Sequence, residues 1–483
     1  MVEERGLAEG NTESAARSGH RAGTRVPRAL DRVRQVAERD KEVRFTALLH
    51  HVDVKSLRTA YLALRRQAVP GVDGVTWEAY GRDLEENLQD LHGRLHRGAY
   101  RAKPSRRVFI PKADGRQRPL GIATVEDKIV QSAVVEVLNA IYEADFIDFS
   151  YGFRPGRSQH DALDALTVGI KRRKVNWVLD ADVADFFTGL DHGWIGRFFE
   201  HRIGDKRVLR LIQQWLDAGV IEEGAWAECD EGTPQGATVS PLLANVYLHY
   251  VLDLWAERWR RRQACGDMVI VRYADDFIVG FEHREDAERF LAELSERFAK
   301  FGLGLKAEKT RLIEFGRNAA RNRAARGLGK PETFDFLGFT HISGKTKDGR
   351  FMVKRRTIAK RMRAKLKEVK AELMRRRHLP IPEAGQWLRS VVRGYLAYHA
   401  VPGNLDAVKT FGDQVERYWR RALRRRSQKA NTTWEQMGRL SDRWLPRPRV
   451  LHPYPEKRFD ARHPRQEPSA VIPHAGICAG GRP

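Results

Sequence analysis

Two short apolar runs in the middle of the chain meet at a pair of adjacent carboxylates. The runs Met268–Tyr273 and Phe277–Gly280 are rich in β-branched and aromatic residues, which predicts two strands with Asp275 and Asp276 at the tip of their hairpin. Asp is common in turns, so turn geometry alone is one interpretation, although the usual glycine of a tight hairpin turn is missing. The other is a metal site, because neighbouring carboxylates repel each other and a bound Mg²⁺ would offset that repulsion.

A second apolar run that carries acidic residues covers Trp177–Phe187. In an extended strand, Asp180 and Asp182 share one face, and carboxylates in so apolar a run are costly unless something binds them. A metal site at the hairpin tip would need such a second contributor.

The elements around these strands have helical periods. Apolar residues recur at helical spacing in one predicted helix, at Leu243, Tyr247, Tyr250 and Leu254. We expect Ser240 at its N-cap and Pro241 at N1. A further helix over 285–301, with Gly302 at C′, leads to a strand over Leu303–Phe315. The order strand, helix, two hairpin strands, helix, strand predicts an antiparallel sheet with helices on one face, and brings Asp182 beside the hairpin tip.

The chain before Trp177 contains three further features. Residues 1–28 are rich in Gly, Ser, Arg and Glu and are not expected to pack. A strand–turn–strand pattern over Val108–Ile122 carries several cations, which are either solvated or, if they face the acidic hairpin, able to hold a triphosphate. The loop Ser150–Ser158 holds two aromatic residues and two arginines, which could clamp a nucleic-acid strand or serve structure alone.

The composition points to a polyanionic partner. With 87 Lys and Arg against 63 Asp and Glu, the net charge is +24 and the pI is near 10.1, which indicates nucleic acid more simply than a membrane surface. No apolar stretch is long enough to span a bilayer and no signal peptide is present, so a cytoplasmic protein is expected. The three cysteines are too far apart in sequence for a disulfide framework or a paired zinc-ligand spacing.

Much of the positive charge lies near the C-terminal end. Residues 351–430 contain 22 Lys and Arg and 6 Asp and Glu, so a net +16 of the chain's +24 lies there. Such a concentration exceeds that of an ordinary solvated face. Helices are predicted over 358–373, 387–398 and 411–425, and a basic helical bundle for generic nucleic-acid binding is one interpretation of them.

Taken in order, the motifs of the chain resemble those of group II intron-encoded reverse transcriptase/maturases. Tyr273–Asp276 looks like the catalytic box of reverse transcriptases, Asp182–Phe187 like their first palm motif, and Pro234–Gly236 with Ser240–Asn245 like the second. A lone Tyr-x-Asp-Asp would be a weak signal, but further motifs follow the same order: Gly71–Gly74, Ile110–Lys112, Tyr151–Arg154, Glu308–Thr310 and Phe336–Phe339.

This resemblance implies an α+β fold of the right-hand polymerase type, with fingers and a ferredoxin-like palm followed by a basic α-helical thumb or maturase domain. We expect an N-terminal extension over residues 1–55, fingers over 56–175, palm over 176–345, thumb over 346–430 and a small DNA-binding region over 431–483. Some relatives end in a metal-dependent HNH nuclease with paired cysteines. Since Cys478 is the only cysteine after the thumb, no HNH endonuclease is expected.

The resemblance also implies catalytic and metal-binding roles. Asp182 and Asp275 would be the main ligands of two Mg²⁺ ions, for which Mn²⁺ is a possible substitute, and Asp276 an auxiliary ligand. Val183 would be a further metal-binding position. Lys309 matches a lysine proposed as proton donor to the leaving group, and a plain surface lysine is the alternative.

Other residues are implied in binding. Lys112 and Arg118 resemble the finger cations that hold the incoming dNTP, and Gln235 and Gly236 would line the nucleotide and the template. Phe187 corresponds to an aromatic ring that excludes a ribose 2′-hydroxyl. In the thumb we expect RNA contacts from Arg424, Arg425 and Arg426.

The function implied is an RNA-directed DNA polymerase that copies group II intron RNA into DNA at a DNA target and assists intron splicing. One rival is a splicing-only RNA-binding maturase with a decayed polymerase site, which the intact Asp182, Asp275 and Asp276 argue against. Another is a reverse transcriptase of a different lineage, in phage defence or retron synthesis. The particular intron, the source of the primer and the oligomeric state stay open.

Overall fold

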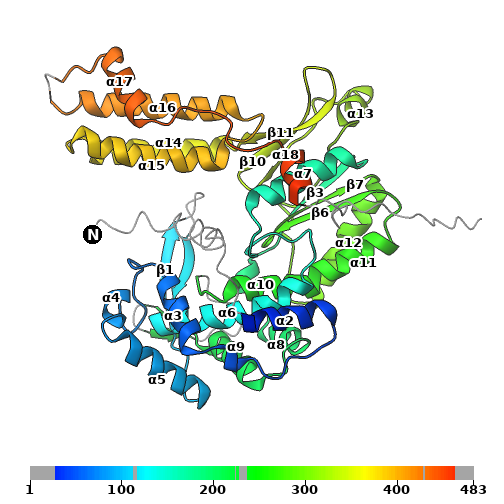
Figure 1. Cartoon of the computed structure of the whole chain (residues 1–483). Helices are drawn as coiled ribbons and strands as arrows, with labels where there is room; N and C mark the ends of the chain where they lie inside the picture. Colours follow the sequence, from blue (N-terminus) through cyan, green and yellow to red (C-terminus); the bar gives the residue numbers. More distant parts are fainter. Residues whose placement is uncertain (1–27, 112–116, 223–224, 228–235, 428–429, 463–483) are drawn as a thin grey trace, which may run out of the picture.

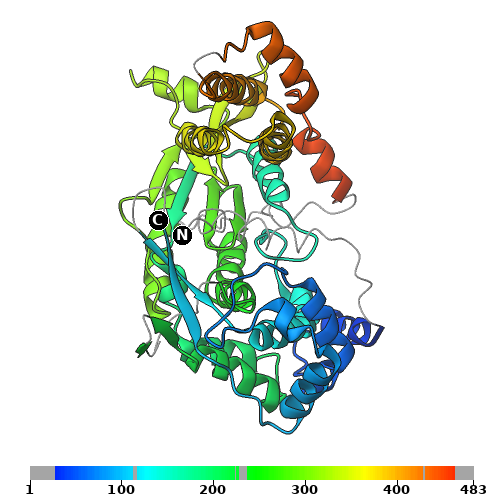
Figure 2. The same ribbon diagram turned by 90° about the vertical axis from the view of Figure 1, so that its left-hand side faces the viewer.

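A computed structural model describes residues 28–111, 117–222, 225–227, 236–427 and 430–462 of the chain. Figures 1 and 2 both place the N-terminal helices (blue) at one end of the molecule and a stack of C-terminal helices (yellow to orange) at the other. The strands that carry the predicted acidic site lie between these ends. The described residues combine many helices with sheets that are antiparallel except for one parallel strand pair, which confirms the predicted α+β class.

The segment predicted as fingers is a helical layer with a small sheet. Its helices are α2 (Arg28–Arg39), α3 (Val54–Ala63), α4 (Trp77–Tyr80), α5 (Leu84–His96) and α6 (Val125–Asp145). Both α2 and α3 pack against α6, whose apolar side chains are buried as its helical period predicts. The sheet has the order β2-β1-β4-β5, from β1 (Ser105–Pro111), β2 (Gln117–Ile122), β4 (Val220–Glu222) and β5 (Ala225–Ala227).

The predicted palm sheet is antiparallel, in the order β6-β7-β3-β8. Its strands are β3 (Trp177–Asp182), β6 (Met268–Tyr273), β7 (Asp276–Phe281) and β8 (Arg311–Glu314). Helix α12 packs on β3 and β7, and α7 packs on β6. The surrounding helices are α7 (Gln159–Arg172), α8 (His192–Glu200), α9 (Lys206–Asp217), α10 (Ser240–Leu248), α11 (Leu254–Arg262) and α12 (Arg284–Lys300). The predicted strands and helices follow one another in the expected order, with Gly302 (φ +71°) after α12, but α8, α9, β4 and β5 lie between β3 and α10 and were not predicted.

Two local predictions in this region are wrong. The strand expected over Leu303–Phe315 is reduced to β8, because Lys306 N donates to Asp182 O (2.9 Å) and the chain then turns at Lys309 and Thr310. The N-cap of α10 is Val239, so Ser240 is the first helical residue. Helix α10 then continues through a π-helical turn, His249–Asp253, into α11.

The C-terminal half adds a second sheet and the predicted thumb helices. Strands β9 (Phe334–Phe336), β10 (Phe339–Lys345) and β11 (Phe351–Thr357) form an antiparallel sheet. Helices α14 (Ala359–Arg375), α15 (Ile381–His399), α16 (Leu405–Arg424) and α17 (Trp434–Trp444) share a hydrophobic core of their own. The boundary predicted between residues 345 and 346 falls inside the hairpin of β10 and β11, so we propose that the thumb begins at α14.

The last described helix, α18 (Pro455–Arg462), returns to the palm and packs against α7. Figure 1 shows it in red beside α7, far from the tip of the thumb. Helix α17 shares the core of α14, α15 and α16, whereas α18 packs on α7. No helix in the described ranges is long and apolar enough to cross a membrane.

Candidate active site

Three carboxylates come together at one end of the palm sheet. Asp276 begins β7 and pairs in register with Asp182, the last residue of β3, while Tyr273 is the opposite partner of Asp276 in the hairpin. The turn between β6 and β7 is Ala274 and Asp275. Ala274 has φ +56°, a conformation that L-residues adopt at a cost and that a turn without glycine requires here. The predicted acidic hairpin beside Asp182 is therefore confirmed.

A buried ion pair supports this turn from behind. Arg272 and Asp253 are both fully buried and form a bidentate pair of 2.7 and 2.5 Å. The same guanidinium donates to Asn245 Oδ1 and to Ala274 O, each at 3.0 Å. The π-helical turn before α11 ends at Asp253. Arg272 therefore links the helix α10–α11 to the carbonyl that precedes Asp275.

The loop before α7 closes the other side of the turn. Tyr151 N donates to Arg272 O (2.8 Å), and Arg272 N donates to Phe149 O (2.9 Å). A Cβ on Gly152 would lie 2.1 Å from Ala274 N, so only glycine allows this contact. Asn245 Nδ2 donates to Gly152 O at 2.7 Å. Sequence reasoning missed this contact, although the glycine between two aromatic residues was a signal for it.

Most of this loop serves structure and not a clamp for nucleic acid. Tyr151 is buried, and Arg154 is a buried partner of Glu143 that also donates to main-chain carbonyls. Arg157 pairs with Asp148. Of the two aromatic residues and two arginines considered as a clamp, Phe153 (φ +57°) is exposed. Its ring is tilted relative to that of Tyr273, with ring centroids 6.3 Å apart.

Two lysines contact the carboxylate of Asp182. Lys309 Nζ lies 2.7 Å from Asp182 Oδ2, and Lys306 Nζ lies 3.4 Å from Oδ1. Lys306 Nζ is also 4.0 Å from Asp185 Oδ1. The structure thus places Lys309 in the site, where sequence alone left a surface lysine as the alternative. It adds Lys306, which the predicted strand had hidden.

Desolvation and the neighbouring carboxylates raise the pKa of one acid of the site. Asp276 is exposed to solvent on one side, yet protein atoms remove part of its hydration. This desolvation, followed by the charges of Asp275 and Asp182, raises the pKa of Asp276 to about 7, against the opposing charge of Arg361. A carboxylate held near others at such a cost fits a cation-binding role.

The carboxylates of the site would supply only some of the ligands of a bound Mg²⁺. Asp182, Asp275 and Asp276 supply hard oxygen atoms, which suit Mg²⁺. Within the described residues, however, no three acidic, His or Cys side chains form a ready metal cluster. Mg²⁺ commonly keeps several waters and takes substrate phosphates as ligands, so an incomplete protein set fits. Val183 has a buried side chain, which leaves only its main chain for such a role. Asp180 is paired with Arg311 at 3.2 Å.

Replacing Asp276 by asparagine is expected to stabilise the metal-free protein more at pH 8 than at pH 5. Folding raises the pKa of Asp276, so this residue costs no folding stability below about pH 4, where the acid is protonated in both the folded and the unfolded chain. The protein then loses stability as the pH rises through about 7. Asparagine does not ionise. Melting temperatures with a chelator at both pH values test this, with Asp442→Asn, at an exposed pair, as control. An equal gain at both pH values would contradict the assignment, and Mg²⁺ should stabilise the wild type more than the variant.

Phe187 lies a few residues after Asp182, which ends β3. It belongs to the short 3₁₀ turn Phe186–Thr188, which follows Asp185 (φ +37°). Phe186 is buried in the core, whereas Phe187 is only partly buried and meets it edge-on, with centroids 5.3 Å apart. One ring therefore anchors the turn, and the other is available to a bound nucleotide.

The predicted nucleotide-binding loop reaches the fingers hairpin. Gly236 has φ +111°, and a Cβ there would lie 2.8 Å from Gly121 O of β2. Thr238 N donates to Gln131 Oε1 of α6 at 3.0 Å. Arg118 lies on β2, opposite Ile110. Lys112 and Gln235, predicted with it, lie outside the described residues.

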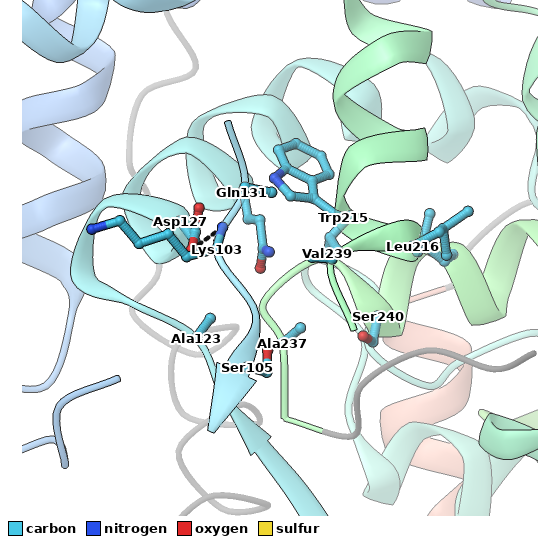
Figure 3. Close-up of a pocket in the computed structure, with 13 residues that line it drawn as sticks. Lys103, Ser105, Ala123, Asp127, Gln131, Trp215, Leu216, Ala237, Val239 and Ser240 are labelled. Carbon is cyan, nitrogen blue, oxygen red and sulfur yellow. Dashed lines mark hydrogen bonds between the residues drawn. The ribbon is translucent and has the colours of Figure 1, made fainter. Parts of the chain in front are cut away.

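A small enclosed space lies behind this loop. Figure 3 shows Asp127 and Gln131 of α6 beside Ala237 and Ser240. Its volume of about 10 Å³ holds at most one water. Asp127 accepts hydrogen bonds from Lys103 N (3.3 Å) and Thr124 Oγ1 (2.7 Å). Asp127 therefore holds the chain at Lys103 against the start of α6, while the bond from Thr238 to Gln131 braces the nucleotide-binding loop, and the space is too small for a ligand.

The arginines predicted to contact RNA differ in their surroundings. Arg424 and Arg425 are exposed at the end of α16. Arg426 is partly buried and donates to Leu379 O at 2.6 Å. Two of the three are therefore open to a phosphate, while Arg426 also holds the connection between α14 and α15.

Backbone strain is confined to the motif loops. Within the described residues, the non-glycine residues with positive φ are Phe153, Asp185, Ala274 and Leu337. Each lies in one of the segments singled out in the sequence. Strained backbone persists where surrounding structure imposes it, and it gathers at functional sites.

Comparison with known proteins agrees with this geometry. Residues 110–341 match the family model described as reverse transcriptase (RNA-dependent DNA polymerase). The chain is 35% identical over 241 residues to Protein YkfC of Escherichia coli K12, covering 44% of this chain and 62% of that protein. It is 34% identical over 233 residues to the group II intron-encoded protein LtrA of Lactococcus lactis subsp. cremoris, covering 47% and 38%.

A shorter match is to the mitochondrial Nuclear intron maturase 2 of Arabidopsis thaliana, with 31% identity over 98 residues, or 20% and 13% of the two chains. The chain therefore spans less than two thirds of the length of these relatives. The resemblance predicted from the ordered motifs is confirmed, and so is the right-hand polymerase class of the fold.

Proposed function

We propose that this chain is an RNA-directed DNA polymerase that copies intron RNA and assists its splicing. The match to a reverse transcriptase family model, and the similarity to a group II intron-encoded protein and an intron maturase, support this proposal. The observation that carries the polymerase is the meeting of Asp182 and Asp276 on neighbouring strands, with Asp275 in the adjoining turn. The substrates would be an RNA template, a DNA primer and dNTPs.

The reaction would be an in-line phosphoryl transfer. Asp182 and Asp275, with Asp276 as auxiliary ligand, would hold two Mg²⁺ ions. Their charge would activate the attacking 3′-hydroxyl and stabilise the leaving pyrophosphate. The protein's own work is positioning. Arg272 fixes the turn of Asp275 through Ala274 O. Lys309 Nζ lies 2.7 Å from Asp182 Oδ2, so it would be placed to donate a proton to the leaving group.

Replacing Phe187 by alanine or valine is expected to relax sugar selection. Phe187 is only partly buried, in the turn that follows Asp182 and Asp185, and removing its ring would open space for a 2′-hydroxyl. Steady-state incorporation of ribonucleotides against deoxyribonucleotides measures the ratio, with Phe186→Leu as the matched core control. An unchanged ratio in a folded Phe187 variant would assign the ring to the core alone.

Replacing Arg424 and Arg425 by glutamine is expected to weaken intron RNA binding and lower the slope of log K against log salt by about 1.4 to 1.8, since each phosphate contact contributes roughly 0.7 to 0.9. Short-template synthesis should fall less. An in vitro splicing assay tests the maturase role in parallel. The control is Arg426→Gln, which removes a bond to Leu379 O and should lower stability instead. Unchanged binding and slope in the double variant would show that both arginines are merely solvated.

A further inference from the structure

A groove of about 840 Å³ lies at the end of the palm sheet opposite the carboxylates. Its walls come from the end of α7, the segment after β8, the hairpin of β10 and β11, and α18. Trp177, which begins β3, pairs with Glu314 at the end of β8, whereas Asp182 ends β3 at the active site. At about 3.3 Å per residue, this strand alone separates the two sites by roughly 17 Å. The groove is therefore separate from the polymerase site.

The rim of this groove is basic. Five cations line it, Lys171, Arg172, Arg317, Lys345 and Arg350, against one carboxylate, Glu456. Two of these cations hold α18 in place, since Lys171 pairs with Glu456 and Arg172 with Asp460 at 2.8 Å. These ion pairs account for the two cations at the end of α7, so no ligand is needed to explain them.

In the part of the chain that the structure describes, the three remaining cations do not hold α18 or another helix in place through a buried ion pair. Within the described residues, Arg317 and Lys345 have no carboxylate partner, and Arg317 donates only to Lys171 O at 3.2 Å. Arg350 pairs with Asp348, but their side chains are 81% and 69% exposed, so this pair adds little stability. Three cations from two segments thus face one groove.

The floor of the groove adds an aromatic ring and bare backbone. Phe351 is partly buried and packs with one side against the main core. Among the lining glycines, Gly349 has open space where a Cβ would lie and lets a ligand approach the main chain, whereas Val175 O covers Gly316 and the Lys354 side chain covers Gly344. A ring between cations and open backbone is the combination that binds single-stranded nucleic acid, by base stacking and phosphate contacts.

We propose that this groove binds a single-stranded segment of RNA outside the template–primer path, with a base stacked on Phe351 and its phosphates held by Lys345, Arg350 and Arg317. The choice of RNA rests on the proposed function, because a structured intron offers unpaired loops whereas a duplex DNA target offers none. The site itself does not depend on polymerase activity.

The charge test replaces Lys345 and Arg350 by glutamine, with Lys55→Gln/Arg82→Gln, two exposed cations of the fingers, as matched control. The probe is a short labelled oligouridylate, added to full-length chain already saturated with unlabelled primer–template. The groove variant should bind it about fivefold more weakly than the control, with a salt slope lower by about 1.4. Extension of the bound primer should be unchanged. Binding equal to that of the control would overturn the proposal.

The stacking test replaces Phe351 by leucine, which keeps an apolar side chain on the core. It should weaken oligouridylate binding about threefold with an unchanged salt slope, because no charge is lost. A photoreactive 4-thiouridine oligomer should crosslink to the peptide that contains Phe351. Crosslinks confined to other peptides would overturn the site, and equal binding of an oligothymidylate would overturn the assignment to RNA. Failure of wild-type primer extension would instead count against the proposed polymerase.

Discussion

Replacing Asp182 or Asp275 by asparagine is expected to lower templated DNA synthesis by on the order of 10³-fold, because each change removes a charged ligand where charge develops during the transfer. Asp182 ends β3 and Asp275 lies in the turn beside it. The two variants should therefore lose DNA synthesis to a similar extent, although one residue ends a strand and the other lies in a turn. RNA binding through the thumb should survive, because the site lies in the palm sheet.

The measurement is primer extension on an RNA template under single-turnover conditions, with RNA affinity and melting temperature determined for each variant. Asp185→Asn is the matched control: its carboxylate is 84% exposed, and asparagine tolerates its left-handed backbone. Near-wild-type synthesis by either Asp182→Asn or Asp275→Asn would refute the assignment. Loss of RNA binding together with synthesis would point to misfolding instead.

Replacing Arg272 by methionine is expected to destabilise the protein by about 3–5 kcal/mol, because it leaves the carboxylate of Asp253 buried without its partner. Both side chains are 0% exposed and bonded at 2.7 and 2.5 Å. Urea unfolding followed by tryptophan fluorescence measures the loss. Arg311→Met, which breaks the half-exposed pair with Asp180, should cost at most about 1 kcal/mol.

A second variant separates stability from positioning. Changing Arg272 to methionine together with Asp253 to leucine removes both buried charges, and such replacements are often neutral in stability. Synthesis should stay low, because Ala274 O still lacks the hydrogen bond from Arg272 that fixes the turn before Asp275. A double variant that regained both stability and synthesis would show that the pair serves folding alone.

The sequence by itself determined the local elements and most of the chemistry. Alternating and helical hydrophobic periods predicted the acidic hairpin, β3, α10 and α12, because these depend on neighbours a few residues apart. Charge inside an apolar strand marked Asp180 and Asp182 without coordinates, and the family resemblance then singled out Asp182 with Asp275 and Asp276 of the hairpin. The one large error, the strand from Leu303, arose because Lys306 N bonds the end of β3, a partner that the local pattern does not reveal.

Only the tertiary structure decided which distant groups meet. Lys309 and Asp182 are 127 residues apart, and Arg172 and Asp460 are 288 residues apart, yet each pair is in contact. The burial of Arg272 with Asp253, the tight approach of Gly152 to Ala274, and the return of α18 to α7 have the same origin. Such contacts depend on how whole elements pack, and packing is set by the sum of all buried surfaces and not by any local pattern.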